Sequence, residues 1–268
     1  MTTTSPAPAS PLRTILLVIG SVLLVGIVAY LVIGVVGNAN RTDASDDVTI
    51  SESFDEVVVD VEVADVVVEY ADVDEATVVF RQNSSNRSFQ FSAEVVGSSL
   101  EVNLDEHWGG FWMPFGNQTS PRVTVTLPES LEALDLDVES GVGDATLDGD
   151  FGEVEFSSGV GDLRLEGSAT RAEVETSVGD ITARRYSVEG DFVVISSTGD
   201  VTLSLDTVPA TLDVRSNVGD QDITLPKGRY AVETETGVGE VSVAVDNDRD
   251  ADTLLRFESS VGDITIRN

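Results

Sequence analysis

Apolar and polar residues alternate along most of the chain beyond residue 48. Between Val57 and Val63 every second residue is valine, and the same step returns at Val201, Leu203 and Leu205. A two-residue step places alternate side chains on opposite faces of a β-strand. An α-helix would instead repeat its apolar residues every three to four positions. We therefore expect an all-β protein whose strands turn one face inward.

A Gly-Asp step, written once as Gly-Glu, interrupts the alternation at intervals of 18, 18, 20, 20, 20 and 23 residues. A period of this size is typical of a chain wound into stacked coils. We predict a single-stranded, β-helix-like solenoid with coils of about 20 residues. In each coil two short strands meet at the Gly-Asp corner, and a looser turn closes the coil. The corners are Gly143-Asp144, Gly161-Asp162, Gly179-Asp180, Gly199-Asp200, Gly219-Asp220, Gly239-Glu240 and Gly262-Asp263.

A hydroxyl group always stands three residues before the corner glycine. Strand parity places it on the inward face, about 4.8 Å from its counterpart in the next coil. There it can bond along the column or to the corner backbone. The alternative, a row of serine nucleophiles, lacks an accompanying base. The column consists of Ser140, Ser158, Thr176, Ser196, Ser216, Thr236 and Ser259.

The aspartate column raises the question of calcium, which β-roll proteins bind through Gly- and Asp-rich nonapeptides. Here the period drifts, and one Gly-Asp per coil offers too few oxygens for the six to eight ligands of calcium. Aspartate after glycine also forms turns by hydrogen-bonding its own corner. We therefore interpret the corners as structural and expect no metal and no cofactor.

One degenerate repeat precedes the regular ones, with Ala64-Asp65 as its corner. Asp65 lies 79 residues before Asp144, close to four periods. We expect strands at 77–81, 89–95, 100–104 and 122–127 to fill this interval. Residues 48–268 would then form one solenoid, irregular over 48–135 and regular over 136–268, because terminal repeats that shield an open end are usually irregular.

The other end of the predicted solenoid has no obvious cap. The chain stops at Arg267-Asn268, directly after the inward pair Ile264 and Ile266. An open β edge pairs with other edges unless charge blunts it. Arg267 and the overall acidity favour a blunted edge, and the alternative is self-association or partner docking through this C-terminal edge.

One segment, from Asp105 to Pro121, departs from the strand pattern. It contains both tryptophans, and its aromatic residues are Trp108, Phe111, Trp112 and Phe115. They form either an exposed loop that contacts a glycan or an envelope protein, or a hydrophobic flap folded over the irregular end. The only histidine, His107, is by itself no evidence of catalysis.

Residues 14–37 are almost wholly apolar. The segment exceeds the roughly 20 residues that span a bilayer, so we predict a transmembrane helix between a tail (1–13) and a linker (38–47). A cleaved signal peptide ending near Gly37-Asn38-Ala39 is the alternative. The short tail and large following domain favour a single-pass plasma membrane protein with its solenoid outside the cytoplasm.

The net charge of the chain limits the classes of molecule that it could bind. The chain has 48 acidic residues against 15 Lys and Arg, a net charge of −33, which argues against nucleic acid and anionic lipid. It has no cysteine, so disulfides and thiolate chemistry are excluded.

The motifs Ser140-Gly-Val-Gly-Asp144 and Ser259-Ser-Val-Gly-Asp263, together with the strand Arg122–Pro128, resemble the bacterial β-strand-repeat family labelled "putative adhesin". The likeness covers roughly residues 48–268. It implies the repeat fold, often behind a membrane segment, and brings no catalytic residues. We expect a non-enzymatic, membrane-tethered envelope solenoid that acts in adhesion, binding or scaffolding of an envelope protein or glycan. The alternatives are an accessory or sensor subunit of an envelope-stress system, a polysaccharide-acting β-helix enzyme and a polymer-forming solenoid.

Overall fold

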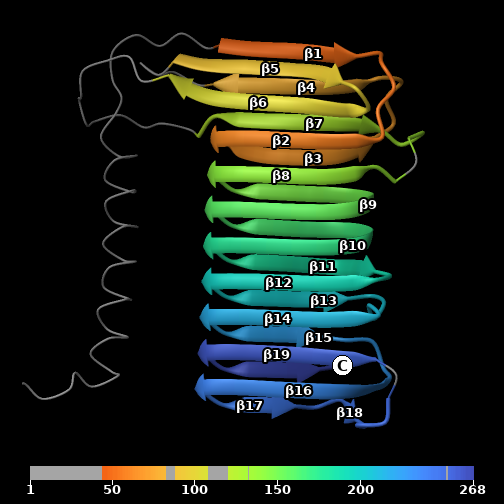
Figure 1. Ribbon diagram of the computed structural model, residues 1–268, viewed down its shortest axis with the longest axis vertical. Helices are drawn as coiled ribbons and strands as arrows, with labels where there is room; N and C mark the ends of the chain where they lie inside the picture. The colour runs from red at the N-terminus through yellow and green to blue at the C-terminus, as the bar shows by residue number, and fades with distance from the viewer. Residues whose placement is uncertain (1–43, 83–87, 108–119, 132, 252) are drawn as a thin grey trace, which may run out of the picture.

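The structure is a computed structural model that describes residues 44–82, 88–107, 120–131, 133–251 and 253–268. These residues form β-strands joined by turns and stacked into one column (Figure 1). The predicted all-β repeat fold is thereby confirmed. In these described ranges no helix is long and apolar enough to cross a membrane. The predicted membrane segment 14–37 lies outside them.

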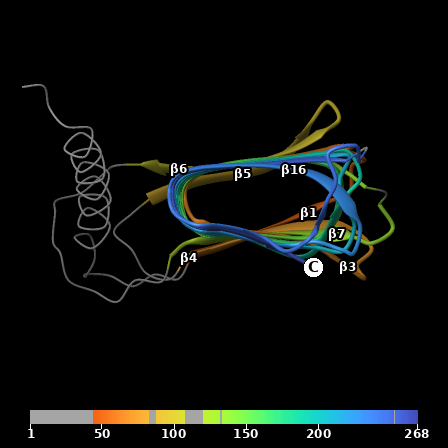
Figure 2. The ribbon, with the colours of Figure 1, turned by 90° about the horizontal axis from the view of Figure 1, so that it is seen from below.

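Each coil is a flattened loop with two walls, seen end-on in Figure 2. The first wall holds the strands that precede the corners, and the second wall holds those that follow them. In spatial order the first wall contains β2 (Glu56–Val63), β8 (Asp135–Val142), the second halves of β9 (Ala145–Val160) and β10 (Leu163–Val178), β12 (Asp191–Thr198), β14 (Thr211–Val218), β19 (Leu254–Val261) and β16 (Arg229–Val238). The second wall contains β3 (Asp65–Ala71), the first halves of β9 and β10, β11 (Ile181–Val188), β13 (Val201–Leu205), β15 (Gln221–Thr224), β20 (Ile264–Arg267) and β17 (Val241–Val243).

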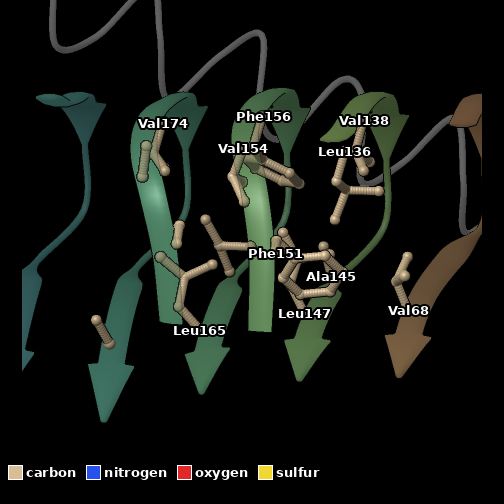
Figure 3. Close-up of a cluster of buried hydrophobic side chains, with 14 of the residues drawn as sticks. Val68, Leu136, Val138, Ala145, Leu147, Phe151, Val154, Phe156, Leu165 and Val174 are labelled. Carbon is tan, nitrogen blue, oxygen red and sulfur yellow. The ribbon is translucent and has the colours of Figure 1, made fainter. Parts of the chain in front are cut away.

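The strands of adjacent coils pair in parallel and in register, which aligns equivalent residues into columns. Leu136 lies beside Val154, and Val154 lies beside Ala172. Figure 3 shows how the inward side chains of the two walls point toward one another. Leu147 and Leu165 of the second wall meet Val154 and its neighbours of the first, and all of them are buried. The apolar columns predicted from the two-residue step therefore form the core.

A cap of antiparallel strands closes the N-terminal end of the stack. On the second wall β7 (Arg122–Pro128) pairs in parallel with β3, then β4 (Ala76–Gln82) and β1 (Ala44–Ile50) follow in antiparallel order. On the first wall β6 (Ser99–His107) pairs in parallel with β2, and β5 (Ser88–Val96) pairs antiparallel with β6. β1 begins inside the segment expected to be a linker. The ring of Phe80 lies 5.7 Å from that of Phe89 and 5.5 Å from that of Phe91, which joins the two sides of the cap.

The placement predicted for the intervening strands is wrong, although the four strands themselves exist. The coil of β2 and β3 stacks directly on that of β8 and β9, since Val57 lies beside Leu136 and Val66 beside Ala145. Asp65 is therefore one coil from Asp144 in space despite 79 residues in sequence. The expected strands β4, β5, β6 and β7 cover the outer side of this first coil instead of forming further coils between Asp65 and Asp144.

The prediction of a bare edge at Ile264 and Ile266 is also wrong. The last coil in sequence, β19 and β20, lies between the coil of β14 and β15 and the coil of β16 and β17 (Figure 1). Ile264 and Ile266 are both fully buried as a result. After β17 the short strand β18 (Asp246–Asn247) leads back toward β19. The coil of β16 and β17 therefore ends the stack.

Candidate functional site

The corner glycines are required by backbone geometry. Their φ angles lie between +142° and +153°, where L side chains are strained. A Cβ atom on Gly199 would also lie 2.0 Å from the carbonyl oxygen of Gly179 in the adjacent coil. Such an approach is possible only without a side chain. The Gly column thus allows the coils to stack at their corners.

The aspartates beside these glycines form a hydrogen-bonded ladder between coils. The Oδ1 atom of Asp144 accepts the backbone N–H of Asp162 at 3.0 Å, and that of Asp162 accepts the N–H of Asp180 at 2.9 Å. We expected each carboxylate to bond within its own corner, but it bonds to the backbone of the adjacent coil instead. In the remaining bonds the N–H of the second residue donates to Oδ1 of the first, and the pairs are Asp65 and Asp144, Asp180 and Asp200, Asp200 and Asp220, Asp220 and Asp263, and Asp263 and Glu240.

The single glutamate of the column, Glu240, stands at the end of the ladder. Its N–H donates to Oδ1 of Asp263 at 2.7 Å, and among the described residues no further coil lies beyond it. Its carboxylate therefore has no backbone N–H of a following coil to accept. The one corner acid that is not an aspartate thus stands where no backbone N–H of a following coil has to be reached.

The hydroxyl column is buried along the regular coils, as predicted. Ser140, Ser158, Thr176, Ser196, Ser216 and Ser259 are all buried, and Thr236 of the last coil is half-buried. Two of the hydroxyls bond to corner carbonyls: Ser196 donates to the Gly199 carbonyl at 3.4 Å, and Thr236 to the Gly262 carbonyl at 3.1 Å. The other five hydroxyl oxygens have no hydrogen-bond partner in the described structure. Without a base beside them, they form a structural column.

In the described part of the chain no group of three or more His, Asp or Glu side chains is arranged to hold a metal ion. Along the aspartate ladder one carboxylate oxygen of each residue is already occupied by a backbone N–H. The one remaining carboxylate oxygen per coil falls far short of the six to eight oxygen ligands that calcium takes.

The outer face of the first wall is strongly acidic near the capped end. Asp60 on β2 and Asp137 on β8 lie in adjacent strands, with Glu139 opposite Asp60. Burial raises the pKa of Asp60, and the charges of Glu139, Asp105, Glu62 and Asp137 raise it further. The pKa of Asp137 is raised by burial and then by the charges of Glu56 and Glu139. This face repels anions and other copies of itself.

A shallow groove of about 400 Å³ lies on the first wall near its other end. Its lining includes Arg215 of β14, Glu258 of β19 and Glu235 of β16, which are neighbours in register. Arg215 is already paired with Asp213. The groove therefore presents two carboxylates beside an arginine that is already in an ion pair.

The coil of β16 and β17, which ends the stack, is more exposed than the regular coils before it. Val238 is 63% exposed and Val241 is 41% exposed, whereas Ile264, which neighbours Val241 in the adjacent coil, is fully buried. Val232, Thr234 and Val243 are half-buried. The open end predicted at the C-terminus therefore exists, but it is formed by β16 and β17. The replacement of the corner aspartate by Glu240 was the sequence signal that could have located it.

Trp108, Phe111, Trp112 and Phe115 lie outside the described residues, so the contact predicted for them remains a prediction. Of the described strands on either side, β6 ends beside the end of β2, and β7 begins with Arg122 beside Asp65 of β3. The carbonyl of Pro121 accepts the N–H of Asp65 at 2.8 Å.

Comparison with known proteins identifies the repeat. The family model described as Toastrack DUF4097 matches residues 54–268. A solved structure of a "putative adhesin" from Bacteroides fragilis is 16% identical, with a TM-score of 0.52, and the alignment covers 85% of this chain and 98% of that one. A "putative cell adhesion protein" from Clostridium sporogenes is 13% identical with a TM-score of 0.39, covering 85% and 99%. A "putative lipid binding protein" from Parabacteroides distasonis is 15% identical with a TM-score of 0.38, covering 85% and 98%. No curated protein sequence matches the chain.

Proposed function

Because the chain belongs to the Toastrack DUF4097 family and its described strands stack into one column, we propose that it is a non-enzymatic, membrane-tethered solenoid of the cell envelope. It acts by binding or scaffolding an envelope protein or glycan, and adhesion is one form of this role. The observation that carries the proposal is the asymmetry of the stack. The end where Ala44 enters is capped, and the other end is open.

The dimensions of the molecule support a tether that displays its open end. Only residues 38–43 separate the predicted membrane segment from β1, and they reach at most about 20 Å. The first wall runs through nine strands from β6 to β16. At about 4.8 Å per step the open coil lies roughly 40 Å from the cap. In this arrangement the cap faces the membrane and the open coil points away from it.

Cysteine labelling on intact cells tests the location. The chain has no cysteine, so Thr202→Cys on the outer face of β13 provides a unique thiol. A membrane-impermeant maleimide should label it without cell lysis, whereas Val194→Cys, whose side chain is buried, should react only after denaturation. Deletion of residues 14–37 should release the solenoid from the membrane fraction. Labelling of Thr202→Cys only after lysis would contradict the proposal.

The partner is tested by in-cell photo-crosslinking. A photoreactive residue placed along the outer faces should capture an envelope component at a few neighbouring positions. A partner embedded in the same membrane would favour the sensor or accessory role over adhesion. Absence of any crosslink from both walls and the open coil would refute a binding role.

A further inference from the structure

The open coil presents a strand edge that is only partly covered. On β16 the N–H of Ala231 donates to the carbonyl of Thr253, toward β19. The backbone N–H and C=O of the next residue, Val232, point to the opposite side. There the N–H donates to Oδ1 of Asn247 at 3.2 Å, and the carbonyl accepts a hydrogen bond from Nδ2 of Asn247 at 3.5 Å. The carbonyl of Tyr230 likewise accepts the N–H of Asp248 at 2.8 Å. β18 therefore covers the beginning of this edge.

Beyond Val232 the edge is free in the described structure. Backbone groups of a strand alternate in direction, so Thr234 and Thr236 point their N–H and C=O groups the same way as Val232. β16 pairs only with β18 and β19, and the first of these pairs ends at Tyr230. Unpaired backbone groups on a sheet edge are a template for an added strand.

The inward face of the same coil is apolar and incompletely covered. Val232, Thr234 and Val243 are half-buried, and Val241 is exposed. The same columns in the interior coils are fully buried, as at Val214 and Ile223. An added strand with apolar residues at every second position would complete this packing.

The outward face of the coil is acidic. Glu233 and Glu235 project from β16, and Glu240 stands at the corner. Glu233 lies 3.3 Å from Arg256, and both side chains are solvent-exposed; neither Glu235 nor Glu240 has an ion pair within the described ranges. A strand added here would place its outward residues directly opposite Glu233 and Glu235, where basic side chains are favoured and acidic ones disfavoured.

We propose that the coil of β16 and β17 docks an extended segment of a partner protein whose residues alternate between apolar and basic, added as a further strand on the free edge of β16. This inference rests on the proposed binding role and names its site and the chemistry of its partner. A second copy of this chain fits less well. Antiparallel pairing centred on the free part of two β16 edges sets glutamate against glutamate, between molecules that each carry a net charge of −33.

The test measures peptide binding to the full chain in neutral detergent. The probe is a fluorescent nine-residue peptide of alternating lysine and valine, compared with one of alternating glutamate and valine. Fluorescence anisotropy should show binding of the basic peptide alone. The double variant E233Q/E235Q should weaken it about tenfold. The matched control E173Q/E175Q changes the same two columns on β10, four coils away, and should leave binding unchanged.

Three outcomes would overturn the proposal. Equal binding of a lysine–valine peptide that is N-methylated at every residue, which blocks both strand edges, would mean attraction by charge without strand addition. Equal weakening by E173Q/E175Q would mean that the whole acidic wall attracts the peptide. Dimerisation of E233Q/E235Q in sedimentation without peptide would make a second copy the occupant. Because the measurement uses purified protein, its failure would leave the surface-labelling test of the proposed function unaffected.

Discussion

At the scale of single residues, the corner aspartate connects coils. Its carboxylate accepts a backbone N–H from the next coil, as Asp180 does from Asp200 at 2.8 Å. Hydrogen bonds to a charged group contribute about 1.5–3 kcal/mol each. Repulsion between carboxylates one coil apart costs about 1 kcal/mol in water and less in salt. The hydrogen bond therefore outweighs the repulsion, and the ladder is stable without a cation.

Removing one carboxylate of the ladder tests this role. Asp180→Ala leaves the N–H of Asp200 without its acceptor and should lower the free energy of unfolding by about 1–2 kcal/mol. Glu240→Ala alters the same column at its free end, where no following N–H depends on the carboxylate, and should change the free energy by less than about 0.5 kcal/mol. Urea unfolding measures both. Equal losses from the two variants would show that the ladder contributes nothing specific.

The acidic residues on the first wall make the stability of the fold depend on pH. Burial and neighbouring acids raise the pKa of Asp60 in the folded state. A raised folded pKa means that the folded state holds this proton more tightly than the unfolded state, so stability falls as the pH rises from the unfolded pKa through the folded one. Asp60→Asn removes that loss. Its stability advantage over the natural chain should therefore grow from pH 3.5 to pH 7 in urea titrations; an advantage that shrinks over this range would contradict the assignment.

At the scale of elements, the strands could be predicted and their order of stacking could not. The two-residue step located the strands around Val194 and Leu203 because inward positions must be apolar. Stacking order is different, since every coil presents the same columns to both neighbours. Val218 pairs with Val261, and Val261 also pairs with Val238. Nothing in the local sequence at Val218 distinguishes these two valines, so proximity in sequence was a poor guide.

The candidate site could be predicted only in part, because its position depends on the stacking order of the coils. An open end, with docking through it as an alternative, was expected from the absence of a cap, but it was assigned to Ile266 because that residue lies near the chain terminus. The aspartate-to-glutamate change at residue 240 and the 23-residue spacing to Gly262 were visible in the sequence. Their meaning depends on the ladder between coils, which is a contact between distant residues.

The inward and outward assignment of the strands gives a prediction at this scale. Val194 of β12 is fully buried, and Val194→Asp places a carboxylate in the apolar core. It should cost more than about 4 kcal/mol and unfold the solenoid. Thr202→Asp on the exposed outer face of β13 should change the free energy of unfolding by less than about 0.5 kcal/mol. Circular dichroism during thermal unfolding distinguishes the two, and similar losses would refute the assignment.

At the scale of the whole molecule, the coil of β19 and β20 joins the coil of β16 and β17, which precedes it in sequence, to the rest of the stack. The amide of Gly219 donates to the carbonyl of Val261 at 3.0 Å, and the amide of Gly262 donates to the carbonyl of Val238 at 2.9 Å. The coil of β16 and β17 therefore rests on β19 and β20 alone. A solenoid whose stability is a sum over neighbouring coils loses one interface when its end coil is removed and two when an interior coil is removed.

Two deletions separate the spatial order from the sequence order. Removal of residues 227–251 takes away the end coil, and the shortened chain should keep most of its stability and the slow hydrogen exchange of the Gly219 and Gln221 amides, which donate to Val261 and Asp263. Removal of residues 251–268 takes away the interior coil with buried Leu255, Phe257, Ile264 and Ile266, and should lower the unfolding midpoint further. If coils stacked in sequence order, the C-terminal deletion would be the milder one. The ranking of the two midpoints in guanidinium therefore decides which coil ends the molecule, and with it where a partner strand can be added.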